Sequence, residues 1–164
     1  MTSSAGRLFD AVAALIGIRQ QVNYEAQAAI ELEMAMGSED DPNGYRFDLL
    51  PEGDAWIIGA RPLFEAIVND VGKNVSVGVI SRRFHNGLVD TFAELASRLS
   101  DKTGLTRVCL SGGTFYNVYL SGRLEERLSK SGFEVFTQRE VPAGDGGLSL
   151  GQALVAASRF KAMH

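Results

Sequence analysis

The chain has 164 residues, of which 45% are hydrophobic and 22% charged, values typical of one globular domain. Its net charge of −4 argues against a basic surface for nucleic acid or an anionic membrane. The single cysteine, Cys109, excludes an internal disulfide, and no apolar run approaches the roughly 20 residues of a transmembrane helix. We therefore expect one domain over residues 1–164, in the cytoplasm and without a signal peptide.

Apolar residues at helical spacing dominate the first half of the chain. The expected elements are helices over 6–15 and 24–36, strands over 46–50 and 55–59, and helices over 63–71 and 76–99. A strand over 75–80 is the alternative at the start of the last helix. Gly17 and Gly37 are expected to end the first two helices, and Asn23 to cap the second. The two strands flank the turn Pro51–Asp54 and are expected to form a hairpin, either joined to the main sheet or apart from it.

The second half alternates strands and helices. The expected elements are a strand over 106–110, a helix over 115–130, a strand over 133–137, a loop over 142–147 and a helix over 148–160. A glycine-rich turn separates each strand from the helix that follows. This alternation predicts an α/β arrangement with parallel strands.

The strongest local signal is the segment Ser111–Asn117. Its paired glycines, Gly112 and Gly113, would let a ligand approach the backbone closely. The following helix would present unpaired N–H groups and a positive dipole end, with Asn117 on its first turn. The alternative is a tight turn in which glycine only relieves strain. The Gly-Lys-Ser/Thr ending of a phosphate-binding loop is absent, and so is the dinucleotide fingerprint.

Two acidic residues have a functional and a structural interpretation each. Asp145 lies between glycines before the last helix, so it is either a ligand for a metal ion or a helix cap. Glu25 is expected at the start of the second helix, where it complements the helix dipole or binds a ribose.

Other reactive residues are few. His85 lies on the long helix, where a lone histidine is more often structural than catalytic. Cys109 lies in an apolar run and is interpreted as a buried small hydrophobe rather than a nucleophile. No catalytic triad or metal-ligating cluster can be assembled from the sequence.

Five segments resemble, in amino-acid sequence and in order along the chain, the C-terminal end of the HypF family of hydrogenase maturation proteins. They are residues 3–15, 24–33, 83–86, 110–117 and 142–152. The resemblance implies the helix-rich C-terminal lobe of the two-lobed ATPase fold that actin, sugar kinases and heat-shock chaperones share. It implies a small mixed sheet, with the first strands of the lobe absent.

The resemblance also implies roles for single residues. Nucleotide-binding positions would be Asp10, Glu25, Gly112, Gly113 and Asn117, and Asp145 would ligate a metal. The sequence differs from the residues that are usual in the family at Thr114, Tyr116, Ala26 and Gly144. The larger side chains of Tyr116 and Ala26 could narrow the nucleotide cleft.

In the family, carbamoyl phosphate and ATP yield carbamoyladenylate, and the carbamoyl group then passes to the C-terminal cysteine of the partner HypE. That group becomes the cyanide ligand of nickel–iron hydrogenase. The implied cofactors are ATP or carbamoyladenylate and a divalent zinc, iron or magnesium ion. The nucleophilic thiol belongs to HypE, so no catalytic residue is expected within this chain alone.

The family's histidine pair and its upstream modules have no counterpart among these 164 residues. We therefore expect an excised lobe, inactive alone, that self-associates through uncovered apolar surface. Two alternatives remain open. One is a threonylcarbamoyl or O-carbamoyl transferase of the same fold, and the other is a non-catalytic binding fragment.

Overall fold

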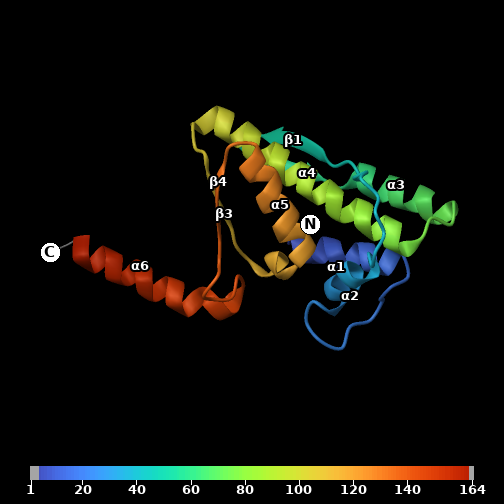
Figure 1. Ribbon diagram of the computed structural model, residues 1–164, viewed down its shortest axis with the longest axis horizontal. Coiled ribbons are helices and arrows are strands. Elements are labelled where there is room, and N and C mark those ends of the chain that lie inside the picture. The colour runs from blue at the N-terminus through green and yellow to red at the C-terminus, as the bar shows by residue number, and fades with distance from the viewer. Residues whose placement is uncertain (1–3, 163–164) are drawn as a thin grey trace.

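A computed structural model describes residues 4–162 and shows a helical body with one helix extending from it (Figure 1). The first half contains α1 (Ala5–Leu15), α2 (Gln27–Ala35), α3 (Arg61–Gly72) and α4 (Val77–Thr103). No helix among residues 4–162 is long and apolar enough to cross a membrane.

The long helix α4 is the centre of the hydrophobic core. It begins where predicted, because the Ser76 hydroxyl accepts a hydrogen bond from the Val79 N–H at 3.2 Å. Its apolar stripe is buried at Ile80, Phe84 and Leu88. The surrounding core residues come mainly from α1, α2, α3 and α5 (Val118–Lys130) and include Phe9, Val12, Leu32, Leu63, Ile67, Leu120, Leu124 and Leu128.

Helix α2 begins three residues later than predicted. Ala26 adopts a left-handed conformation (φ 60°) just before the helix, which a helical residue cannot do. The Asn23 N–H donates to the Gln27 side chain at 2.7 Å and closes the preceding turn. Asn23 is therefore not the helix cap, and Glu25 lies in an exposed turn rather than in the first helical turn.

The predicted hairpin is confirmed and stands apart from the other strands. Strands β1 (Asp48–Glu52) and β2 (Ala55–Gly59) pair antiparallel. Pro51 and Glu52 belong to β1, opposite Trp56 and Ala55, so the turn is shorter than predicted.

The second half has the predicted α/β alternation. Strands β3 (Arg107–Leu110) and β4 (Glu134–Thr137) pair in parallel, and α5 (Val118–Lys130) connects them. The predicted helix over 115–130 begins late, because the short 3₁₀ helix η1 (Gly113–Tyr116) comes first. A second 3₁₀ helix, η2 (Asp145–Gly147), leads into α6 (Leu148–Ala162).

Cys109 is exposed, so its interpretation as a buried hydrophobe is wrong. Along β3 the side chains alternate between the two faces of the sheet. Leu110 is buried and Val108 partly buried against the body, whereas Arg107 and Cys109 are exposed. The apolar run alone could not reveal that a two-stranded sheet is covered on only one face.

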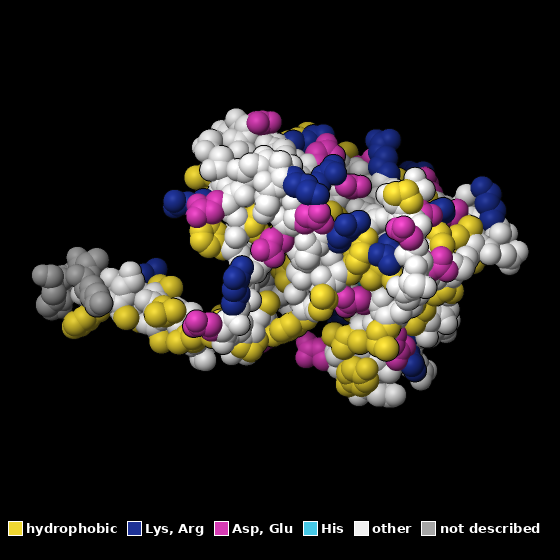
Figure 2. Space-filling model, viewed as in Figure 1, with side chains coloured by type: hydrophobic (Ala, Val, Ile, Leu, Met, Phe, Trp, Pro, Cys, Tyr) yellow, Lys and Arg dark blue, Asp and Glu magenta, His cyan; other side chains and the backbone are white. Residues whose placement is uncertain are grey.

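Helix α6 extends from the body (Figure 1), and apolar side chains lie along it (Figure 2). All side chains from Leu148 to Phe160 are exposed. Leu154, for example, keeps 63% of its surface accessible. The helix is therefore an uncovered apolar surface of considerable length.

Candidate functional site

The two glycine-rich turns that the sequence singles out lie side by side, beyond the ends of β3 and β4. The Gly112 N–H donates to the Ala143 carbonyl at 2.8 Å, and the Ser111 hydroxyl lies 3.4 Å from the same oxygen. The Gly144 N–H donates to the Tyr116 hydroxyl at 3.1 Å. The structure thus brings Gly112 into one site with the loop that precedes Asp145.

The geometry of the first turn suits a closely bound ligand. Gly112 has φ 108°, which side-chain-bearing residues rarely adopt. A Cβ atom at Gly113 would meet no atom within 4 Å, so the space beside this backbone is open. Gly112 thus serves the turn itself, while Gly113 leaves room for a partner.

A groove of about 780 Å³ lies next to the two turns. Its walls are the Ser111–Gly112 turn, the loop from Gln138 to Gly147, and α6. The exposed residue Asp145 opens η2 at this groove. The groove is largely apolar apart from groups such as Asp145 and Arg159.

Asn117 is placed differently from the prediction. It precedes α5 as the N-cap, and only 8% of its surface is exposed. Its side-chain oxygen accepts from the Leu120 N–H at 2.7 Å, and its side-chain nitrogen donates to His85 Nε2 at 2.8 Å. The amide is thus engaged inside the protein, and a nucleotide contact through it stays a prediction.

His85 is fully buried, in agreement with its structural interpretation. Its Nδ1 lies 2.8 Å from the Ser81 carbonyl oxygen, so this nitrogen carries the proton and Nε2 accepts from Asn117. Burial lowers the pKa of His85 to about 4. The imidazole is therefore neutral and links the interior of α4 to the start of α5.

The neighbours of His85 hold the loop before β1. Arg83 donates to Asp41 at 2.9 and 2.7 Å and to Asp70 at 2.8 Å. Asn86 donates to the carbonyl oxygens of Asp41 and Asn43 at 2.8 and 3.0 Å. The segment that resembles the HypF family at residues 83–86 thus organises the fold. Sequence reasoning missed this role, because nothing in the pattern pairs residues about 40 positions apart.

The two other predicted nucleotide contacts lie on α1 and in the turn before α2. Asp10 is half-exposed on α1, which contacts η1, and it pairs with Arg7 at 3.4 Å. Glu25 is exposed in the turn before α2. Among residues 4–162, no hydrogen bond joins either carboxylate to the glycine turns, so their ligand contacts stay predictions.

A complete metal site is not formed by the part of the chain that the structure describes. No group of three His, Cys, Asp or Glu side chains there could hold an ion. Asp145 offers one carboxylate, whereas catalytic metal sites usually have about three protein ligands. The described residues alone therefore do not fit a metal.

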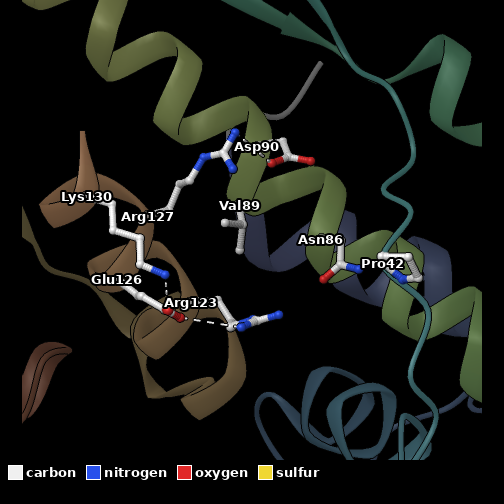
Figure 3. Close-up of a pocket in the computed structure, with 8 residues that line it drawn as sticks. All are labelled: Pro42, Asn86, Val89, Asp90, Arg123, Glu126, Arg127 and Lys130. Carbon is white, nitrogen blue, oxygen red and sulfur yellow. Dashed lines mark hydrogen bonds and ion pairs between the residues drawn. The ribbon is translucent and has the colours of Figure 1, made fainter.

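A smaller pocket of about 240 Å³ lies between α4 and α5 (Figure 3). The basic side chains that line this pocket are paired with carboxylates. Lys130 and Arg123 lie 2.6 and 3.4 Å from Glu126. Arg127 lies 3.8 Å from Asp90. The pocket contains none of the predicted nucleotide- or metal-binding residues, so we place the candidate site at the glycine turns.

Comparisons with known proteins agree on one family. Residues 1–152 match the family described as carbamoyltransferase, Kae1-like domain, second subdomain. The carbamoyltransferases HypF of Synechocystis sp. and Rhodobacter capsulatus are 36% and 38% identical over 94% and 98% of this chain. A crystal structure of full-length HypF in the phosphate- and nucleotide-bound form superposes with a TM-score of 0.89, at 46% identity over 94% of this chain. The chain spans about a fifth of the length of each of these proteins (19%, 20% and 20%).

Proposed function

Because this chain belongs to the HypF carbamoyltransferase family, we propose that it forms the nucleotide-binding lobe of a carbamoyltransferase. The proposed donor is carbamoyladenylate, made from carbamoyl phosphate and ATP. The proposed acceptor is the C-terminal cysteine of HypE, for the synthesis of the cyanide ligand of nickel–iron hydrogenase.

One observation carries the proposal: the Gly112–Gly113 turn leaves an open approach to the backbone beside the Asp145 loop. A nucleotide can reach a main chain that no side chain covers. The related full-length HypF structure was obtained in a nucleotide-bound form. We infer that the nucleotide contacts Gly112 and Gly113 here, with Asp10, Glu25 and Asn117 as further proposed contacts.

In this proposal the lobe binds and orients the donor. The turn holds the adenylate so that its carbamoyl carbon is presented to the acceptor thiol, and a closed cleft excludes water that would hydrolyse it. A divalent metal would polarise the carbamoyl carbonyl. Asp145 is proposed as one of its ligands, and the others would come from outside the described residues.

The experiment is a calorimetric titration of ATP into the complete encoded protein and its Gly113→Val variant. A Cβ atom at this position would meet no atom of the folded protein within 4 Å, so we expect the variant to fold. We expect ATP binding to be lost in the variant. As a control, Gly122→Ala places a side chain in equally open space on α5. Equal ATP affinity of wild type and Gly113→Val would contradict the proposal.

The 164 residues alone are not expected to transfer a carbamoyl group. They offer one wall of a cleft and one proposed metal ligand. Chemically made carbamoyladenylate, a divalent ion and reduced HypE can be supplied to the chain. Mass spectrometry then reports any carbamoyl group on the terminal cysteine of HypE, and transfer above background would show that this lobe suffices.

A further inference from the structure

Tyr116 ends η1, directly after the glycine turn, and 56% of its surface is exposed. A large aromatic ring with this exposure is a poor contributor to the core. Its position beside Gly112 and Gly113 places it within reach of whatever the turn binds. The ring therefore needs an explanation other than packing.

The ring is held in place at both ends. Its backbone belongs to the 3₁₀ helix, and its hydroxyl accepts the hydrogen bond of the Gly144 N–H at 3.1 Å. This tether restricts the rotation of the side chain. The ring is thus pre-organised, which reduces the entropy that a ligand must remove on binding.

Gly144 is shaped to accept the ring. A Cβ atom at this position would lie 2.9 Å from Tyr116 Cε2 and 3.1 Å from the hydroxyl oxygen. Any residue other than glycine would push the ring away. The loop therefore supports Tyr116 where it touches Gly144 and leaves more than half of its surface free.

We propose that Tyr116 is a specificity-determining residue that stacks against the base of the bound nucleotide. The inference rests on the proposed nucleotide-binding function and adds the group that recognises the base. A largely exposed aromatic ring near an open glycine backbone suits a ligand with both a flat heterocycle and a phosphate or ribose part. The turn binds the second part and the ring binds the first.

The test uses two ligands, ATP and tripolyphosphate, which has no base. Affinities are measured by calorimetry for the complete encoded protein and for Tyr116→Leu. Stacking on an aromatic side chain typically changes affinity by about tenfold or more. We expect Tyr116→Leu to weaken ATP binding by about tenfold and to leave tripolyphosphate binding within about twofold of wild type.

Two further variants separate stacking from indirect effects. Tyr116→Phe keeps the ring and removes only the tether, so it should lose less ATP affinity than Tyr116→Leu. Phe136→Leu removes another exposed aromatic ring, on β4, and should leave ATP affinity unchanged. An equal loss for both ligands in Tyr116→Leu, or no loss for ATP, would overturn the inference. If wild type binds neither ligand, the proposed function itself fails.

Discussion

The side-chain amide of Asn117 donates a hydrogen bond to Nε2 of His85 across 2.8 Å, in the interior of the protein. The same amide caps α5 through Leu120. Because Asn117 directly follows η1, which begins at Gly113, this contact fixes the end of η1 against α4. His85, which is not among the proposed nucleotide contacts, thus helps to set the geometry of the proposed site.

The buried imidazole predicts a dependence of stability on pH. His85 is neutral in the folded protein, where its pKa is lowered to about 4, and it takes up a proton near pH 6.5 when unfolded. The unfolded state therefore binds more protons between these values. The contribution of the neutral, buried His85 to the stability of the folded protein is complete above pH 6.5 and is lost as the pH falls toward 4. The loss amounts to roughly 3 kcal/mol over this window.

The measurement is urea unfolding from pH 7 to pH 4 for wild type and His85→Gln. Glutamine can donate and accept hydrogen bonds but does not titrate, so the carboxylates are the same in both proteins. We expect the variant to be less stable at pH 7 but to lose less stability on acidification. Parallel stability curves for the two proteins would contradict a neutral, buried His85.

Two glycines within helices should respond oppositely to alanine. A Cβ atom at Gly87 in α4 would lie 2.2 Å from the Tyr45 carbonyl oxygen, where the loop crosses the helix. We expect Gly87→Ala to destabilise the protein by about 1–3 kcal/mol through overpacking. Gly122 in α5 faces open space, so Gly122→Ala should stabilise it by about 0.5–1 kcal/mol. Thermal unfolding of both variants checks the pair, and destabilisation of similar size at both positions would refute the close approach at Gly87.

Replacing Asp145 should affect metal binding and not folding. Asp145 is exposed at the start of η2, so its removal costs at most a helix-terminal charge, worth about 0.3–1 kcal/mol. We expect Asp145→Ala in the complete encoded protein to lose bound metal and transfer activity with an unchanged circular dichroism spectrum. Glu140→Ala, in the same loop, is the matched control. Full metal content of Asp145→Ala by elemental analysis would leave Asp145 with only its favourable charge in the first turn of η2.

The chain as printed should self-associate through α6. Leu150 and Leu154 are four residues apart on this helix, 48% and 63% exposed, so they share one uncovered face. We expect light scattering to detect dimers or larger species at high concentration. The double variant Leu150→Lys, Leu154→Lys should be monomeric. The control Leu105→Lys, which changes a 68% exposed leucine that does not lie on α6, should still self-associate. A monomeric wild type would count against this expectation.

Local patterns in the sequence were sufficient for most of the fold. Helix α4 runs to Thr103, past its predicted end at residue 99, but its start follows from Ser76 and its body from the apolar stripe. The same holds for β3, β4 and the glycine turns between strand and helix. The start of α2 was missed, because the left-handed Ala26 depends on a turn that sequence periodicity does not encode.

Contacts between residues far apart in the chain could not be predicted from the sequence. The inward direction of Asn117 depends on His85, 32 positions earlier, and the exposure of Cys109 depends on how far the sheet is covered. The pairing of Tyr116 with Gly144 is of the same kind. Such contacts can be recognised only in the three-dimensional structure. In contrast, Gly112, Gly113 and Asp145 were chosen as candidates from the order of residues along the chain alone.

Because no other element of the described chain covers α6, we expect this helix to become fully ordered only when another surface docks on it. Isolated helices of about 12–15 residues are marginal in water, and α6 has 15 residues, including Gly151. Since its described side chains are all exposed, tertiary burial adds little to its helix–coil equilibrium. Its backbone amides should therefore exchange with solvent much faster than those of α4. Any surface that covers α6 must supply the free energy that orders it, so ordering and docking become one cooperative step.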